Sequence, residues 1–311
     1  MPHVWSHLIF GDEAMKVVGR QEAIGDAFLR RVFHLGCQGP DMLFYHRFWL
    51  GPLAGVLPSL AGNIHRSRCG DFLLAMVDLA VGRAADDPVV VYTAGFLTHH
   101  VLDRNMHPFV FYRSGFRKWN HQRLEVALDA LVVRRKLGLE AWKTPLAERI
   151  DVGGRLPDGV AEMWHALVNR IYPEPAAGLS PKVWHEAYRD MKRALRLFHD
   201  PWGVKRILTL GRTAPMTFRR RYPPLDYANE AHAVWRHPAV PEETHTESWW
   251  ELWAVALEDA RSVLEKAFAY LERGGDVSGR AALAEAIGDV GYDTGKPCGG
   301  GYVIRYAEPI L

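Results

Sequence analysis

Histidine and carboxylate residues recur at helical spacing between residues 99 and 125. His99 precedes Asp103 by four residues, and Asp103 precedes His107 by four. A second pair, His121 and Glu125, has the same spacing. Residues four apart lie on one face of an α-helix, one turn from each other. Imidazole nitrogen and carboxylate oxygen are zinc ligands, so the stretch predicts a site for more than one metal ion.

A single pair at this spacing is weak evidence, because such a pair more often forms a surface hydrogen bond. The prediction depends on accumulation, since nine of the fifteen histidines lie in the first 121 residues. Some of them, such as His65 and His99, follow apolar residues, which predicts burial. Buried histidines and carboxylates need partners, and a shared metal ion would satisfy several at once.

Four segments extend this pattern: Met1-Pro2 with residues 6–11 (SHLIFG), residues 35–41 (LGCQGPD), residues 95–103 (GFLTHHVLD) continuing to His107-Pro108, and residues 121–125 (HQRLE) followed by Asp129. Together they resemble the zinc-dependent phospholipase C family. His65 is similar to a histidine that the family places between the second and third segments. Residues 227–230 (YANE), with Trp235 and Pro238, form a further similar segment. The resemblance covers the first half of the chain well and the second half loosely, and it is closest to an intracellular bacterial branch.

The resemblance implies a site of three metal ions. Eight side chains match the family's ligands: His7, Asp41, His65, His99, Asp103, His107, His121 and Glu125. By position, one ion would be bound by residues 41, 65, 99 and 103, and a second ion by residues 107, 121 and 125. His7, Asp103 and the amino terminus would bind a third, so that Asp103 bridges two ions. We therefore expect two or three Zn²⁺ ions per chain, with Asp41 also orienting the attacking water and Asp103 and Asp41 as the catalytic residues.

The sequence departs from the secreted members of the family at two points. Those enzymes lose a signal peptide and bind metal through a new amino-terminal tryptophan, whereas residues 1–4 show no such leader. Removal of Met1 would leave the Pro2 amine as a ligand, and His3 is a rival ligand. The spacing from Asp103 to His107 is also shorter, and Pro108 is expected to end the helix there.

Helical periodicity dominates the chain and no alternation of period two is sustained, which predicts an all-α fold. Apolar faces predict helices over residues 10–18, 23–33, 72–81, 89–102, 119–137, 160–171, 181–198 and 247–271. Gly36 marks a helix end, and Gly39-Pro40 marks a tight turn that would present Asp41. Proline-rich residues 173–181 and 215–241 predict long loops that could cover the site.

The family's fold is a multi-helix bundle of the phospholipase C and P1 nuclease type. We expect a metal-binding catalytic region over residues 1–150 and a helical region over residues 151–311 packed on it as one continuous domain. The aromatic residues that follow Asp41 (Phe44, Tyr45, Phe48 and Trp49) are expected to share its pocket. Most of Trp235, Trp249, Trp250 and Trp253 are expected to pack in the core, and the alternative is an aromatic wall for an acyl chain or a choline-like head group.

Composition restricts the location and partners of the protein. The chain of 311 residues is long enough for a large core and has a net charge of +2, which indicates no polyanionic partner. The basic clusters at 134–136 and 219–221 are interpreted as solvated surface. The apolar stretch 72–81 is too short to span a bilayer. Three cysteines without an export signal favour a reducing cytoplasm, and Cys37 and Cys69 are either extra ligands or, more favourably, small buried residues.

Clustered metal ions can activate a water molecule and bind the oxygens of a phosphate ester, so we predict a phosphoric-ester hydrolase that is phospholipase C-like. We expect no transmembrane segment and no stable nucleic-acid complex. A phosphomonoesterase or single-strand nuclease on the same fold is one alternative, and a non-catalytic metal-binding protein is another. A di-iron carboxylate bundle is disfavoured, because its signature is Glu-x-x-His and the order here is His-x-x-x-Glu.

Overall fold

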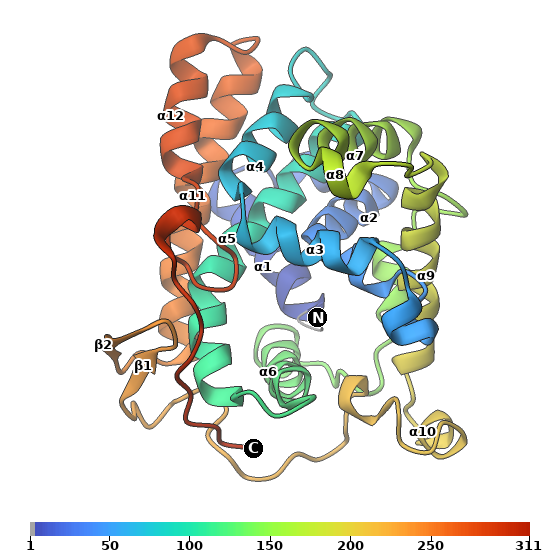
Figure 1. The fold of residues 1–311 in the computed structure, drawn as a ribbon, viewed down its shortest axis with the longest axis vertical. Helices are drawn as coiled ribbons and strands as arrows, with labels where there is room; N and C mark the ends of the chain where they lie inside the picture. Colours follow the sequence, from blue (N-terminus) through green and yellow to red (C-terminus); the bar gives the residue numbers. More distant parts are fainter. Residues whose placement is uncertain (1–3) are drawn as a thin grey trace.

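The computed structural model describes residues 4–311, except for the side chain of Pro52, and its fold is all-α apart from one small hairpin (Figure 1). The α-helices are α1 (Val4–Val17), α2 (Ala27–Gly36), α3 (Leu57–Arg66), α4 (Cys69–Asp78), α5 (Pro88–Ser114), α6 (Asn120–Leu137), α7 (Asp158–Ile171), α8 (Pro173–Ala176), α9 (Lys182–Phe198), α10 (Val204–Leu208), α11 (Trp249–Glu272) and α12 (Val277–Ile287). Short 3₁₀ helices are η1 (Gln21–Ile24), η2 (Gly39–Tyr45), η3 (Phe48–Leu53), η4 (Ala147–Ile150), η5 (Ala214–Met216) and η6 (Cys298–Gly300). The expected all-α class is thereby confirmed.

Helix α5 is the central element of the fold. It is 27 residues long and is buried along nearly its whole length, because apolar residues surround it on all sides. Its start is fixed by Asp87, whose side chain accepts a hydrogen bond from the Val89 amide at 2.7 Å, and by Pro88 in the first turn. Helices α1, α2, α6, α7 and α11 all pack against it, and Figure 1 shows it running through the middle of the molecule.

Helices α2 and α5 approach each other closely at two glycines. A Cβ atom on Gly95 would collide with the Phe33 carbonyl and lie 2.8 Å from the Cys37 amide, and one on Gly36 would collide with the Tyr92 carbonyl. Gly39, with φ of +52°, places its Cα against the His99 ring in the same way. The absence of side chains at these positions brings the end of α2, and η2 after it, directly onto α5.

Pro108 does not end α5, so this expectation was wrong. The helix continues to Ser114 with Pro108 inside it. Phe109 and Val110 beyond the proline are fully buried, and Tyr112 is nearly so. Burial of these side chains outweighs the loss of one backbone hydrogen bond, which costs about 3 kcal/mol in an unsupported helix. His107 is therefore held within a continuous helix.

Helix α1 begins six residues earlier than the predicted start at residue 10, so that His7 is helical. The side chain of Asp129 on α6 accepts hydrogen bonds from the amides of Trp5 and Ser6 at 3.0 and 2.9 Å. This buried carboxylate satisfies amide groups that the first turn of a helix leaves without partners. It ties α1 to α6 at the height of His7.

Other helix boundaries also differ from those predicted from the hydrophobic periodicity. The expected helix over 23–33 is divided into η1 and α2 at Asp26, which caps α2 by accepting from the Phe28 and Leu29 amides. Helices α3 and α12 were not predicted. Within the expected loop 215–241, β1 (Trp235–His237) pairs antiparallel with β2 (Val240–His245), and α8 lies in the expected loop 173–181.

The core is continuous across residue 150, because α7, α9 and α11 contribute buried side chains to the same cluster as α1, α2 and α5. Trp235, Trp249 and Trp253 are buried in it, while Trp250 is partly exposed. Within residues 4–311, no helix combines the length and apolar character that a membrane span requires.

We expect Gly95→Ala to lower the free energy of unfolding by about 1–3 kcal/mol, because its methyl group must push α2 and α5 apart. Urea denaturation measures this change. Gly62→Ala in α3 is the matched control, since a Cβ there meets nothing within 4 Å. It should leave stability unchanged or raise it by up to about 1 kcal/mol. Equal stability of both variants would contradict the close approach.

Candidate metal centre

The eight predicted ligand side chains lie together around α5. Their donor atoms form three groups, and within each group the atoms lie within 4.8 Å of one another. The groups are His7, His99 and Asp103; Asp41, His65 and His99; and His107, His121 and Glu125. The side chains come from α1, η2, α3, α5 and α6, so five separate elements meet at one place.

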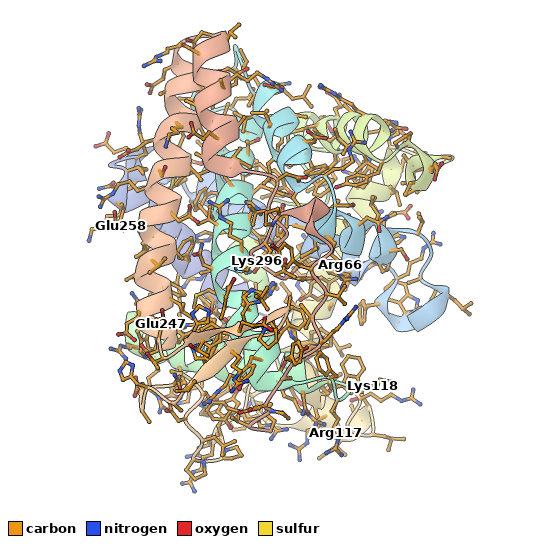
Figure 2. The ribbon with its side chains drawn as sticks, turned by 60° about the vertical axis from the view of Figure 1, so that its left-hand side comes forward. Arg66, Arg117, Lys118, Glu247, Glu258 and Lys296 are labelled. Carbon is orange, nitrogen blue, oxygen red and sulfur yellow. The ribbon has the colours of Figure 1, made fainter. Side chains whose placement is uncertain are left out.

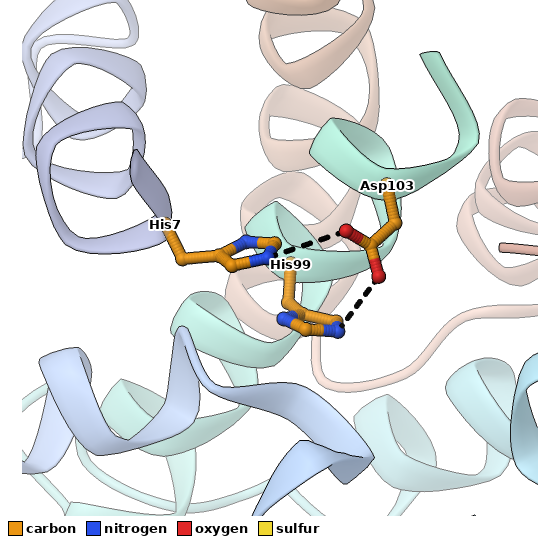
Figure 3. A group of neighbouring side chains, drawn as sticks. All are labelled: His7, His99 and Asp103. Carbon is orange, nitrogen blue, oxygen red and sulfur yellow. Dashed lines mark ion pairs between the residues drawn. The ribbon is translucent and has the colours of Figure 1, made fainter. Parts of the chain in front are cut away.

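Asp103 lies at the junction of these groups. Its Oδ1 is 3.2 Å from His7 Nε2, and its Oδ2 is 3.0 Å from His99 Nε2 (Figure 3). His107 Nε2 lies 3.5 Å from Oδ1, and His65 Nε2 lies 3.9 Å from Oδ2. The two oxygens thus face different sets of histidines, which is the arrangement that a bridging carboxylate needs.

The contact between His99 and Asp103 is close but is not a hydrogen bond. Among the residues that the structure describes, neither His99 Nε2 nor Asp103 Oδ2 has a hydrogen-bond partner, although the two side chains are 0% and 3% exposed. Buried polar atoms are rarely left in this state. A cation between them would satisfy both atoms, so the residues present fit a metal ion.

Backbone carbonyls fix three of the histidine rings. Nδ1 contacts a carbonyl oxygen in His99 (Cys37, 3.0 Å), His65 (Ala61, 2.7 Å) and His107 (Tyr292, 3.2 Å). A carbonyl only accepts hydrogen bonds, so each Nδ1 donates and carries the proton. In the neutral ring, Nε2 then presents its lone pair to the cluster, as metal-binding histidines do.

The third group is formed by α5 and α6. His121 Nε2 is 2.8 Å from Glu125 Oε1, one turn along α6, and His107 Nε2 is 3.7 Å from the same oxygen. The Phe111 ring packs against His121 with 4.6 Å between centroids. Glu125 is fully buried, whereas the His121 side chain is 18% exposed. This group lies nearer the surface than the other two.

The acidic groups of the cluster strongly favour positive charge beside them. Burial alone would raise the pKa of Asp103, but His107, His99 and His7 lower it well below its usual value. Burial opposes protonation of His65, yet its hydrogen bond to Asp41 raises the pKa of His65 to about 9. Protons and metal ions therefore compete to supply the same positive charge.

His100 points away from the cluster. Its Nε2 donates to the Val290 carbonyl at 2.8 Å, and burial lowers its pKa to about 3, so the ring is neutral. Cys37 also lies outside the three groups, with its Sγ 3.5 Å from Thr98 Oγ1. Cys69 lies in a separate group with Asp289 and Cys298, whose Sγ is 3.3 Å from that of Cys69.

The segment after α12 closes the cluster from one side, and the sequence analysis did not single it out. Tyr292 places its ring 4.9 Å from His65 and 4.5 Å from His100 between centroids. Asp293 Oδ1 lies 3.8 Å from His107 Nδ1, and its Oδ2 accepts from Arg66 Nε at 2.7 Å. The flanking glycines 291 and 295 were the available signal, because they permit tight backbone approach.

A cavity of about 390 Å³ opens onto the cluster at His65 and Asp293. Its wall is formed by Arg66, Phe111, Phe116 and the C-terminal residues 291–304. The expected loops 173–181 and 215–241 do not line it, so the C-terminal segment is the cover. Figure 2 shows Arg66 on the right-hand side of the view, with Arg117 and Lys118 below it. A larger cavity of about 1030 Å³ lies outside α6 and contains none of the eight side chains.

Other expected neighbours are placed differently. Of the aromatic residues after Asp41, Phe44 packs against His65 with 5.5 Å between centroids, while Trp49 is 56% exposed on the outside. Phe48 packs against Phe198. The rival third-site ligands Pro2 and His3 lie outside the described residues, so that part of the expectation stays a prediction.

We expect chelation to lower the melting temperature, and added zinc to restore it. Removing a bound cation would leave Asp41, Asp103 and Glu125 balanced only by histidine protons, and any ligand that binds only the folded state stabilises it. Differential scanning calorimetry with and without EDTA measures the shift. An unchanged melting temperature, in protein shown by elemental analysis to have lost its metal, would contradict this expectation.

We also expect His99→Gln to reduce the zinc content of the purified protein, whereas His100→Gln should retain it. Of these two histidines, only His99 presents a nitrogen to the cluster, and Gln at position 100 keeps a donor for the Val290 carbonyl. Elemental analysis, with circular dichroism as the folding control, compares the two. Metal loss confined to the His100 variant would show that the helix register is wrong.

Comparison of the chain with protein-family models, curated proteins and solved structures found no match in any of the three.

Proposed function

We propose that the protein is a metal-dependent phosphoric-ester hydrolase, phospholipase C-like, built on a bundle of the phospholipase C and P1 nuclease type. The observation that carries the proposal is the position of Asp103. Its two oxygens face separate groups of histidines, which supports two or three Zn²⁺ ions sharing one carboxylate. The sequence resemblance and the donor set of five histidines and three carboxylates support zinc in particular.

We assign different roles to the metal ions and to the individual side chains of the site. Bound zinc ions would supply the positive charge that activates a water molecule and stabilises a phosphate ester during in-line displacement. Asp103, in the middle of α5, would bridge two of the metal ions and so fix the distance between them. Asp41 lies 3.2 Å from His65 Nε2 and keeps 15% of its side chain exposed, and this partial exposure supports the role of orienting a water that we propose for it.

The cavity at His65 supports a substrate with both a phosphate and an apolar part. The Arg66 side chain is 72% exposed and provides a guanidinium group that suits phosphate oxygens. Phe111, Phe116 and Val303 form an apolar wall beside it. A phosphodiester that carries an acyl glycerol fits this combination, and we propose phospholipid as the substrate class.

A bundle site with a di-iron carboxylate centre is disfavoured by the donor set. Such centres take most of their ligands from glutamate, whereas histidine supplies five of the eight candidate side chains here. A substrate panel of a phosphatidylcholine analogue, a nitrophenyl phosphodiester, a nitrophenyl phosphomonoester and single-stranded DNA tests the choice among hydrolases. Turnover of the monoester or the DNA alone would replace the phospholipase assignment by one of its alternatives.

We expect Asp103→Asn to reduce hydrolysis of a nitrophenyl phosphodiester by more than about 100-fold while the fold remains. An amide cannot balance two cations as a carboxylate does, whereas the surrounding helices keep their own apolar contacts. Asp190→Asn is the matched control, because Asp190 is also buried beside a histidine, 3.5 Å from His46 Nδ1, but outside the three groups. Full activity of folded, zinc-loaded Asp103→Asn protein would refute the bridging role.

A further inference from the structure

Residues 201–211 form an exposed apolar knob around the short helix α10. None of these residues is buried. Trp202 is 86% exposed, Leu210 is 90% exposed, and Ile207 and Leu208 are 74% and 77% exposed. Figure 1 shows α10 at the edge of the molecule, beyond the end of α9 and away from the other helices.

This concentration of apolar side chains is unusual for the chain. Among the described residues, twelve large apolar side chains are more than half exposed, and five of them lie between residues 202 and 210. Scattered apolar residues on a surface need no explanation, but a contiguous patch marks an interaction site.

Hydrogen bonds hold the knob in one conformation. Asp200 Oδ2 accepts from the Arg206 amide at 2.8 Å, and Lys205 Nζ donates to the His199 carbonyl at 2.8 Å. The Gly211 amide donates to the Arg206 carbonyl at 2.8 Å, and Thr209 Oγ1 lies 3.0 Å from the hydroxyl of Thr213. The apolar side chains are therefore presented by an ordered segment.

The charge around the knob is predominantly positive. Residues 201–225 contain six basic residues and no acidic one: Lys205, Arg206, Arg212, Arg219, Arg220 and Arg221. Four of them line a cavity of about 460 Å³ together with Trp202, and Asp200 is the one acidic residue in that lining. Because the whole chain has a net charge of only +2, this positive charge is a local feature. The arginines at 219–221, interpreted from sequence as plain solvated surface, thus adjoin the most exposed apolar segment.

We propose that residues 201–221 dock the protein on an anionic phospholipid membrane surface. An apolar tip with a tryptophan, surrounded by basic residues, matches an interface where acyl chains lie below negatively charged head groups. A symmetric contact with a second copy would place two sets of these six cations against each other, which charge repulsion opposes. The membrane therefore fits both the apolar tip and the charge.

Co-sedimentation with vesicles tests the proposal. The vesicles are phosphatidylcholine alone or phosphatidylcholine with phosphatidylglycerol, at low and high salt. A double variant, Ile207→Ser with Leu208→Ser, removes the apolar tip, and Arg206→Gln with Arg221→Gln weakens the charge. The matched controls are Val277→Ser, at a position 87% exposed at the start of α12, and Arg273→Gln at the end of α11.

The wild-type protein should bind the anionic vesicles, and added salt should weaken the binding. Each double variant should bind about tenfold or more weakly, whereas the controls should bind like wild type. Quenching of tryptophan fluorescence by brominated lipid should diminish in Trp202→Phe protein. Absence of vesicle binding, or equal binding by all variants, would overturn the proposal.

Two further measurements separate the other outcomes. Analytical ultracentrifugation tests for a second copy: a wild-type dimer that becomes monomeric in the Ile207→Ser, Leu208→Ser variant would replace the membrane by a subunit interface. Hydrolysis of a water-soluble nitrophenyl phosphodiester should be the same in wild type and in both double variants. Vesicle binding does not depend on that activity, so a protein without hydrolase activity that still binds vesicles would refute only the proposed function.

Discussion

The burial of Asp103 is the constraint on which the rest of the structure depends. An isolated carboxylate in a protein interior costs on the order of several kcal/mol. Asp103 shares His65 with Asp41 and shares His107 with Glu125. Histidines from α1, α3, α5 and α6 surround these carboxylates, and their charge lowers the pKa of Asp103. The packing of the helices and the compensation of this charge therefore depend on each other, because moving any of these helices would leave a buried carboxylate without its histidine partner.

The close contact of α2 with α5 brings the residues that follow α2 next to the histidines of α5. Gly36 and Gly95 allow two backbones to touch, and Gly39 allows η2 to lie against the His99 ring. Asp41 follows two residues later and reaches His65 on α3. Small residues thus bring three candidate ligands together from segments that are distant in sequence, at the expense of tolerance to any added methyl group.

Sequence could predict the parts of the site that are local. The spacing of His99, Asp103 and His107 defines one helix face whatever the rest of the chain does. Asp41, His65 and His7 were assigned as ligands only through the family resemblance, because nothing in their own neighbourhood fixes their distance from α5. Tyr292 and Asp293 were missed because they reach the cluster from an irregular segment without periodicity, held by contacts such as the Tyr292 amide on the His65 carbonyl at 2.9 Å.

The predicted helix boundaries were wrong where tertiary packing overrode the local preference of the sequence. Pro108 should have ended α5, but the buried residues beyond it hold the helix together. Helix α1 extends to Val4 because Asp129, 123 residues away from Ser6, satisfies its first amides. Neither effect can be read from a local window, since both depend on a partner that folding brings near.

The same packing argument bears on what the centre does. A structural zinc site closes four ligands around one ion and is sealed from solvent. Here a single carboxylate adjoins several histidine groups, and a cavity of about 390 Å³ meets the cluster at His65. The C-terminal segment lines this cavity and also supports His107 and His100 through backbone carbonyls. A cluster held by backbone contacts and reached by a cavity leaves room for a ligand to enter, which agrees better with the proposed catalytic role than with a closed structural site.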